Sequence, residues 1–110
     1  MSRPLLSVAG GALLRCLLSR VNDERNRIIL TSWTSVDWQS LTFAGERHRA
    51  SFLLTGPGAA DLARRWTDGL DEADLPLGGG RFVADLTVTT GDAQPDGTVP
   101  VELEALTLDD

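Results

Sequence analysis

The sequence predicts a single α+β domain, a two-layer sandwich in which two helices cover one face of a mainly antiparallel five-stranded sheet. Its 110 residues are the usual size of one compact domain. Two segments repeat apolar residues at helical spacing, and the segments between and after them alternate apolar and polar residues as strands do. The expected order is helix, three strands, helix, two strands, and helices usually gather on one side of the sheet in such chains.

The first helix is expected over residues 12–22. Its apolar stripe consists of Leu13, Leu14, Leu17, Leu18 and Val21. Gly10 and Gly11 disfavour a helix immediately before it, so we expect residues 1–10 to be attached only loosely to the domain. The same region has an early arginine and a short apolar run, as a signal peptide has. A weak targeting signal is therefore the alternative to an amphipathic helix.

Three strands are expected between residues 27 and 55, joined by two tight turns. One turn is placed at Gly45, because the first position of a two-residue hairpin turn needs positive φ. The other is placed at residues 34–37 and sets Trp33 opposite Trp38. In this register His48 lies on an apolar face, and alternation sends both tryptophans to the opposite face of the sheet.

The second half of the chain is expected to add one helix and two strands. The helix, within residues 56–70, has an apolar stripe that consists of Ala59, Leu62, Ala63, Trp66 and Leu70. The strand at residues 81–88 is expected to turn Phe82 and Leu86 inward, and the strand at residues 99–106 to turn Val101 and Leu103 inward. Since Leu106 and Leu108 break this parity, we expect a bulge or a strand end near Ala105.

Composition excludes several classes of partner. The net charge of −6 repels a phosphate backbone, so nucleic-acid binding is not expected. No segment approaches the ~20 consecutive apolar residues that span a bilayer, so no membrane contact is expected. The single Cys16 permits no internal disulfide and suits a reducing compartment, which favours a cytoplasmic location. All ten basic residues are arginine, a usage typical of bacterial coding bias.

The sequence contains no assembled catalytic, cofactor or metal motif, and we expect none of these sites. With one histidine and one cysteine, it has no metal-ligand spacing. The segment "GPGAAD" lacks the lysine of a phosphate-binding loop and the three glycines of a dinucleotide site. We therefore expect a protein that is not an enzyme. A small enzyme that uses His48, with a carboxylate such as that of Asp85, is the alternative.

The face opposite the helices is the best candidate for a functional surface. Its expected members are Trp33, Trp38, Arg47, Arg49 and Leu53. Tryptophan and arginine are the residues most enriched at binding hot spots, which predicts a protein-protein interaction or self-assembly module, with self-association into a homo-oligomer as one form. Alternatively, the two arginines only pair across strands with Glu102, Glu104 or Asp85, while one tryptophan folds over a neighbour.

The segments "GERHRASFLL", "AADLARRWTDGLDEADLPL" and "GGRFVADLTV" resemble the middle of the small tail-terminator, or tail-completion, proteins of phages and gene transfer agents. The likeness covers about residues 45–88. It implies a protein that forms a homo-oligomeric ring on a tail tube and that has no catalytic residues to carry over. The first two expected strands, with Trp33 and Trp38, depart from that family. A bacterial family with a different role is the alternative.

Overall fold

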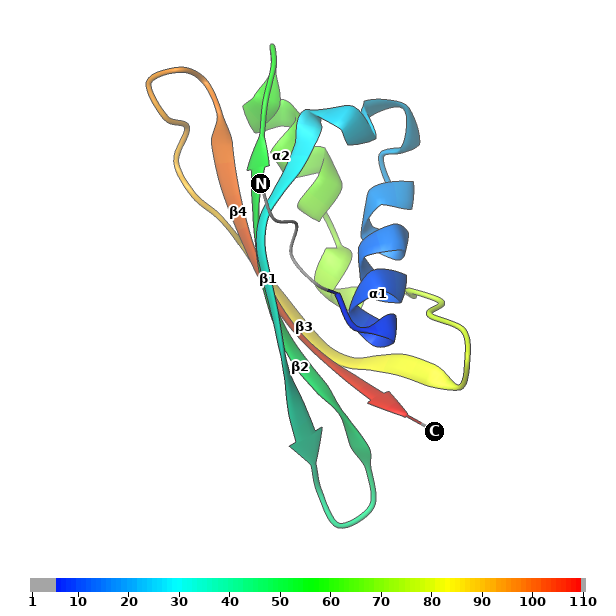
Figure 1. Cartoon of the computed structure of the whole chain (residues 1–110). Helices are drawn as coiled ribbons and strands as arrows, with labels where there is room; N and C mark the ends of the chain where they lie inside the picture. Colours follow the sequence, from blue (N-terminus) through cyan, green and yellow to red (C-terminus); the bar gives the residue numbers. More distant parts are fainter. Residues whose placement is uncertain (1–5, 110) are drawn as a thin grey trace.

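The structure, a computed structural model, describes residues 6–109 apart from the side chain of Asn22. Its helices are α1 (Val8–Ser19), α2 (Ala59–Thr67) and the short 3₁₀ helices η1 (Asn22–Arg27) and η2 (Leu70–Glu72). Its strands are β1 (Ile28–Gln39), β2 (Ala44–Leu54), β3 (Arg81–Thr90) and β4 (Val99–Asp109). They form one antiparallel sheet in the order β1-β2-β4-β3. Figure 1 shows α1 and α2 on the same side of this twisted sheet, whose other face carries no helix within the described residues.

The predicted α+β class with two helices and an antiparallel sheet is confirmed, but the prediction of five strands is wrong. The described chain has four strands, because residues 28–39 form one long strand without the turn expected at residues 34–37. That segment contains neither glycine nor proline, and its branched and aromatic residues favour an extended backbone. The two expected N-terminal strands are therefore a single strand, β1.

The hairpin turn between β1 and β2 lies at residues 40–43, not at Gly45. The Ser40 backbone N–H donates to the Phe43 carbonyl (2.8 Å), and Ser40 Oγ accepts from the Phe43 backbone N–H (3.1 Å). Gly45 lies inside β2, where it pairs with Trp38 on one side and Leu108 on the other. A Cβ at Gly45 would overlap the carbonyl oxygen of Thr107. Glycine is needed there for the close approach of β4 and not for a turn.

Two β-bulges decide which side chains face the helices. In β1, Leu30 pairs with Phe52 and Ser32 with Ser51, so Thr31 is the extra residue and the alternation of side chains shifts after it. In β3, the register shifts between Val83 and Asp85 in the same way. In contrast, β4 pairs regularly with β2 over its whole length, so the bulge expected near Ala105 is absent from this strand.

The core lies between the helices and one face of the sheet. Its largest fully buried apolar side chains are Leu13 and Leu17 of α1, Leu62 and Trp66 of α2, Leu70, and Phe52, Leu54, Val99, Val101 and Leu103 of the sheet. The Trp66 indole Nε1–H donates to the Leu17 carbonyl (2.8 Å), which ties α2 to α1. Phe52 meets the Trp66 ring edge to face, with centroids 5.1 Å apart.

Helix α1 begins four residues earlier than the sequence predicted. Ser7 caps it by accepting the Gly10 backbone N–H at 3.0 Å, and Ala9 and Gly10 are buried. A Cβ on Gly10 would lie only 3.0 Å from the indole Nε1 of Trp33. This glycine is a point of close packing and not a helix breaker. Residues 6–10 are thus packed on the domain, which corrects the expectation of loose attachment, while residues 1–5 lie outside the described residues.

Candidate functional site

The candidate surface is the sheet face that points away from the helices, which we call the open face. It includes Thr34, Val36 and Trp38 of β1, Arg47, Arg49, Ser51 and Leu53 of β2, Phe82, Asp85 and Thr87 of β3, and Glu102, Glu104, Leu106 and Leu108 of β4. Four of the five predicted surface residues therefore lie on it: Trp38, Arg47, Arg49 and Leu53.

Trp33 is the fifth predicted surface residue, and its placement is wrong. The bulge at Thr31 turns Trp33 toward the helices, where it is 6% exposed. Its ring meets Phe52 edge to face (centroids 6.5 Å apart) and lies beside His48 (5.7 Å). A contact surface on the open face cannot include this side chain.

One end of the open face is apolar, and most of it was not predicted from the sequence. Val36 is 66% exposed, and the exposed rings of Phe43 and Phe82 meet edge to face with centroids 6.2 Å apart. These rings come from opposite sides of β4, whose Leu106 and Leu108 also belong to this end. The sequence did contain a signal for the two leucines: Leu106 and Leu108 continue the alternation of Glu102 and Glu104, so they belong to the same face of the strand.

The central part of the open face is charged. Arg49 and Glu104 pair across β2 and β4 (Nη2–Oε1 2.8 Å) with both side chains exposed, as the alternative of simple cross-strand pairing expects. Arg47 makes no ion pair with any described residue. An open depression of about 380 Å³ lies between the two regions and is lined by Val36, Trp38 and the two arginines. Charged and apolar side chains thus meet at one hollow on this face.

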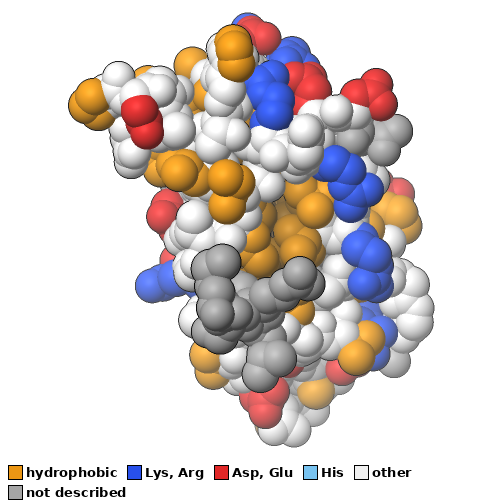
Figure 2. Space-filling model, turned by 45° about the horizontal axis from the view of Figure 1, so that its top comes forward, with side chains coloured by type: hydrophobic (Ala, Val, Ile, Leu, Met, Phe, Trp, Pro, Cys, Tyr) orange, Lys and Arg blue, Asp and Glu red, His pale blue; other side chains and the backbone are white. Residues whose placement is uncertain are grey.

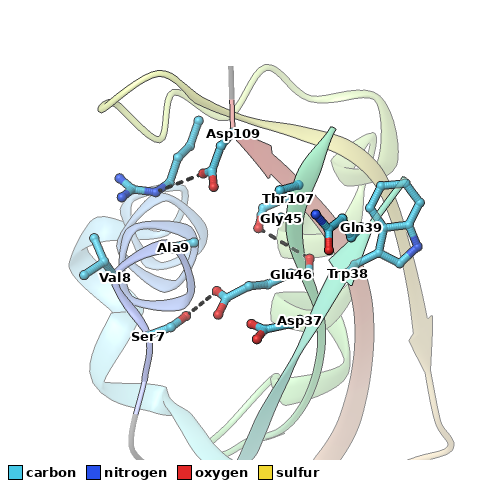
Figure 3. Close-up of a pocket in the computed structure, with 12 residues that line it drawn as sticks. Ser7, Val8, Ala9, Asp37, Trp38, Gln39, Gly45, Glu46, Thr107 and Asp109 are labelled. Carbon is cyan, nitrogen blue, oxygen red and sulfur yellow. Dashed lines mark hydrogen bonds and ion pairs between the residues drawn. The ribbon is translucent and has the colours of Figure 1, made fainter. Parts of the chain in front are cut away.

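A second, polar cleft of about 500 Å³ lies on the other side of the sheet, at the N-terminus of α1 (Figure 3). Its carboxylates are those of Asp37, Glu46 and Asp109. Ser7 Oγ donates to Glu46 Oε1 (2.6 Å), and Asp109 pairs with Arg81 (3.5 Å). Figure 3 shows the indole of Trp38 pointing away from this cleft. Two of its acids therefore have partners in the chain itself.

His48 is fully buried and contacts Thr107, one of the residues that line this cleft. The Trp33 indole N–H lies 3.1 Å from Ser35 Oγ and 3.4 Å from His48 Nδ1, and Ser35 Oγ is 2.8 Å from the same Nδ1. A proton on Nδ1 would point at the indole N–H, which is itself a donor. We therefore assign Nδ1 as a hydrogen-bond acceptor and place the proton of the neutral ring on Nε2. Nε2 then donates to Thr107 Oγ1 (2.8 Å). Both ring nitrogens are occupied by the protein.

The environment of His48 favours its neutral form. Burial lowers the pKa of His48 below its ordinary value of 6.5, and the Glu46 carboxylate, 4.0 Å from Nε2, opposes this shift only in part. Asp85, the carboxylate suggested as a catalytic partner, lies on the open face and so on the other side of the sheet. The structure does not bring His48 and Asp85 together.

The remaining reactive groups have structural partners. Cys16 Sγ–H donates to the Pro76 carbonyl (3.1 Å), and burial raises the pKa of its thiol. Within residues 6–109, no group of three or more histidine, cysteine or acidic side chains could hold a metal ion. The helices of the same part of the chain are all too short or too polar to cross a membrane.

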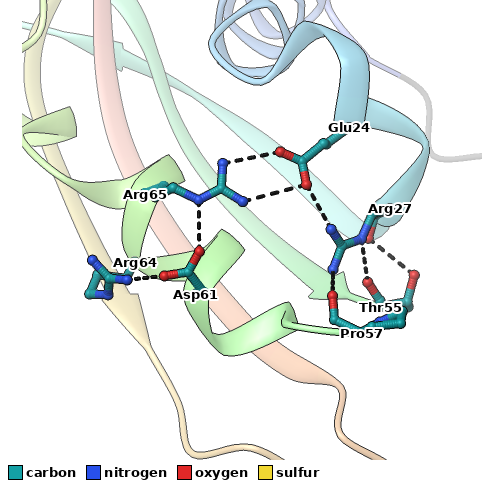
Figure 4. Close-up of polar contacts among 7 residues, drawn as sticks. All are labelled: Glu24, Arg27, Thr55, Pro57, Asp61, Arg64 and Arg65. Carbon is teal, nitrogen blue, oxygen red and sulfur yellow. Dashed lines mark hydrogen bonds and ion pairs between the residues drawn. The ribbon is translucent and has the colours of Figure 1, made fainter.

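An arginine-carboxylate cluster joins η1 to α2 (Figure 4). Glu24 accepts from Arg65 (3.0 Å) and from Arg27 (2.7 Å), and the hydrogen bond from Arg65 is the main reason why the pKa of Glu24 lies below its ordinary value. Arg27 also donates to the Thr55 carbonyl (2.9 Å) and to that of Pro57. Figure 2 shows arginine and acidic side chains side by side on the surface. The cluster fastens the "GPGAAD" connection.

Comparisons of this chain with family models, with curated proteins and with solved structures found no match.

Proposed function

We propose that this protein is a non-enzymatic protein-protein interaction module whose contact surface is the open face. The observation that carries the proposal is the apolar end of that face, where three large apolar side chains are exposed: Val36 of β1 (66%), and Phe43 and Phe82 (41% and 40%), whose rings meet edge to face. Trp38 of β1 lies on the same face. Contiguous apolar patches on a soluble domain mark interaction surfaces more often than single exposed residues do. Leu106 and Leu108 of β4 belong to the same end of the face, but they are only 9% and 7% exposed and add little exposed apolar area.

The chemistry of the face favours a protein over a nucleic acid. Arg47 and Arg49 share it with three carboxylates, those of Asp85, Glu102 and Glu104. With two arginines and three carboxylates, the face has no excess of positive charge to bind a phosphate backbone, although its aromatic rings would suit the stacking of bases. Aromatic and arginine side chains are enriched at protein interfaces, and the open face carries both.

The geometry of His48 supports a structural role for that residue in this proposal. Its ring is sealed from solvent, and both nitrogens are hydrogen-bonded to side chains of β1 and β4. A general base needs a nitrogen within reach of a substrate proton. We therefore build the proposal on the open face alone.

A matched pair of valine substitutions tests the proposal. Val36→Asp places a carboxylate on the open face, and Val8→Asp places one on α1 at nearly the same exposure, 66% against 70%. Complex formation is measured for each variant in two ways: by sedimentation velocity of the purified protein and by affinity capture from a bacterial lysate. Wild type and Val8→Asp should form the same complexes, and Val36→Asp should lose them. If the wild type forms no complex of either kind, or Val36→Asp keeps them all, the proposed function is wrong.

A further inference from the structure

The charged residues of the open face form two rows of opposite sign on neighbouring strands. Arg47 and Arg49 belong to β2, and Glu102 and Glu104 belong to β4. In the register of the sheet, Arg49 is level with Glu104, and Arg47 is level with Leu106. Asp85 of β3 lies at the same level as Leu106. The face therefore has a positive half and a negative half, divided by the boundary between β2 and β4.

A surface of this kind is complementary to itself under a two-fold rotation. If the axis runs parallel to the strands between β2 and β4, it places β2 of one copy over β4 of the other at the same level. Arg49 then faces the partner's Glu104. Arg47 comes over the partner's Leu106 and beside the partner's Asp85.

At the level of Trp38, the same rotation stacks apolar side chains on apolar side chains. Trp38, Gly45, Leu108 and Phe82 lie at one level across the four strands. Because β1 of one copy comes over β3 of the other, Trp38 lies over the partner's Phe82. An axis perpendicular to the strands would reverse this order and bring the apolar end toward the opposite end of the partner's face. The distribution of apolar and charged side chains thus selects one orientation.

We propose that the occupant of the open face is a second copy of this chain, packed face to face about a two-fold axis parallel to β2 and β4. This inference rests on the proposed function and names its partner. Two sheets packed in this way lie about 10 Å apart, which leaves room for one layer of side chains from each copy. Arg47 has no ion pair among the described residues, and in this dimer it comes close enough to the partner's Asp85 to form one.

The size of the face is sufficient for such a dimer. Four strands about 4.8 Å apart and about ten residues long, at about 3.3 Å per residue, give a flat footprint of roughly 600 Å². Side-chain relief raises the accessible area above that figure, toward the ~800 Å² per partner of a standard interface. The exposed apolar side chains at one end, those of Val36, Phe43 and Phe82, supply apolar contact area for such an interface.

Charge reversal at one contact tests the geometry. Arg49→Glu sets a carboxylate against the partner's Glu104, and Glu104→Arg sets a guanidinium against the partner's Arg49; either clash occurs twice in a symmetric dimer. Each single variant should therefore dimerise more weakly than the wild type, on the order of 100-fold. When the two variants are mixed, both contacts pair opposite charges, so a 1:1 heterodimer should form. The double variant Arg49→Glu/Glu104→Arg should dimerise again.

Sedimentation equilibrium of the pure variants and of their mixture provides the measurement, with one variant carrying a tag to resolve the heterodimer. Both side chains are exposed, so melting curves should confirm that the variants remain folded. A wild type that dimerises while the mixed variants stay monomeric would overturn the proposed orientation. A wild type that is monomeric at all concentrations, or that forms a ring of more than two copies in electron micrographs, would overturn the two-fold dimer. If that monomer still captures another protein and Val36→Asp does not, the proposed function stands and only this inference fails.

Discussion

The buried histidine predicts how the stability of this protein depends on pH. His48 is the only histidine of the chain, and burial lowers its pKa below the ordinary value of 6.5. Between the pKa of the folded protein and 6.5, the unfolded chain therefore binds a proton that the folded protein excludes. The free energy of unfolding should be highest above pH 6.5 and should fall as the pH is lowered below it.

The magnitude follows from the one proton involved. Uptake by the unfolded chain alone changes the free energy of unfolding by up to about 1.4 kcal/mol per pH unit. The groups that face the ring are Trp33 and Ser35 from β1, Thr107 from β4 and the Glu46 carboxylate from β2, and Glu46 alone is titratable. The slope ends at the pKa of His48 in the folded protein, because below it the folded protein binds the same proton. Glu46 favours the charged ring, so it keeps this pKa closer to 6.5 and narrows the pH range of the slope.

The assay is urea unfolding at closely spaced pH values from about 5 to 7.5, a range above the usual carboxyl pKa values. His48→Gln, which keeps a donor toward Thr107 and does not titrate, should be less stable by about 1–3 kcal/mol, because Ser35 loses its partner. Its free energy of unfolding should show no slope in this range. A wild type whose stability is constant below pH 6.5, or rises there, would refute the burial argument, as would a slope that persists in His48→Gln.

Two further predictions compare neighbouring residues of the same type. Trp33→Ala should lower the free energy of unfolding by about 3–5 kcal/mol, because it empties a core position, whereas Trp38→Ala should cost no more than about 1 kcal/mol; equal losses in chemical denaturation would contradict the bulge at Thr31. Gly11→Ala should stabilise α1 by up to about 1 kcal/mol, since its Cβ would meet only the end of Arg15. Gly10→Ala should lose this gain, because its Cβ would press on Trp33; thermal melts that show the same gain for both variants would argue against the packing of α1 on that ring.

The prediction of the open face depended on side-chain alternation, which works only while the register stays regular. Alternation placed Arg47, Arg49 and Leu53 correctly, because β2 pairs with both neighbours without a bulge of its own. It failed for Trp33, where a single extra residue in β1 exchanges the two faces. Phe82 was expected inward and lies on the open face for the same reason in β3.

Local sequence therefore determined the two amphipathic helices, the antiparallel strands, the histidine on the core side and the arginines opposite it. Each of these follows from a repeat of apolar residues within one segment, and such a repeat needs no knowledge of the rest of the chain. The two bulges and the start of α1 were decided by contacts between distant segments. Gly45 meets β4, and Gly10 meets Trp33 of β1. In both cases a glycine that suggests a turn or a helix break by itself serves close packing, and only the assembled tertiary structure distinguishes these roles.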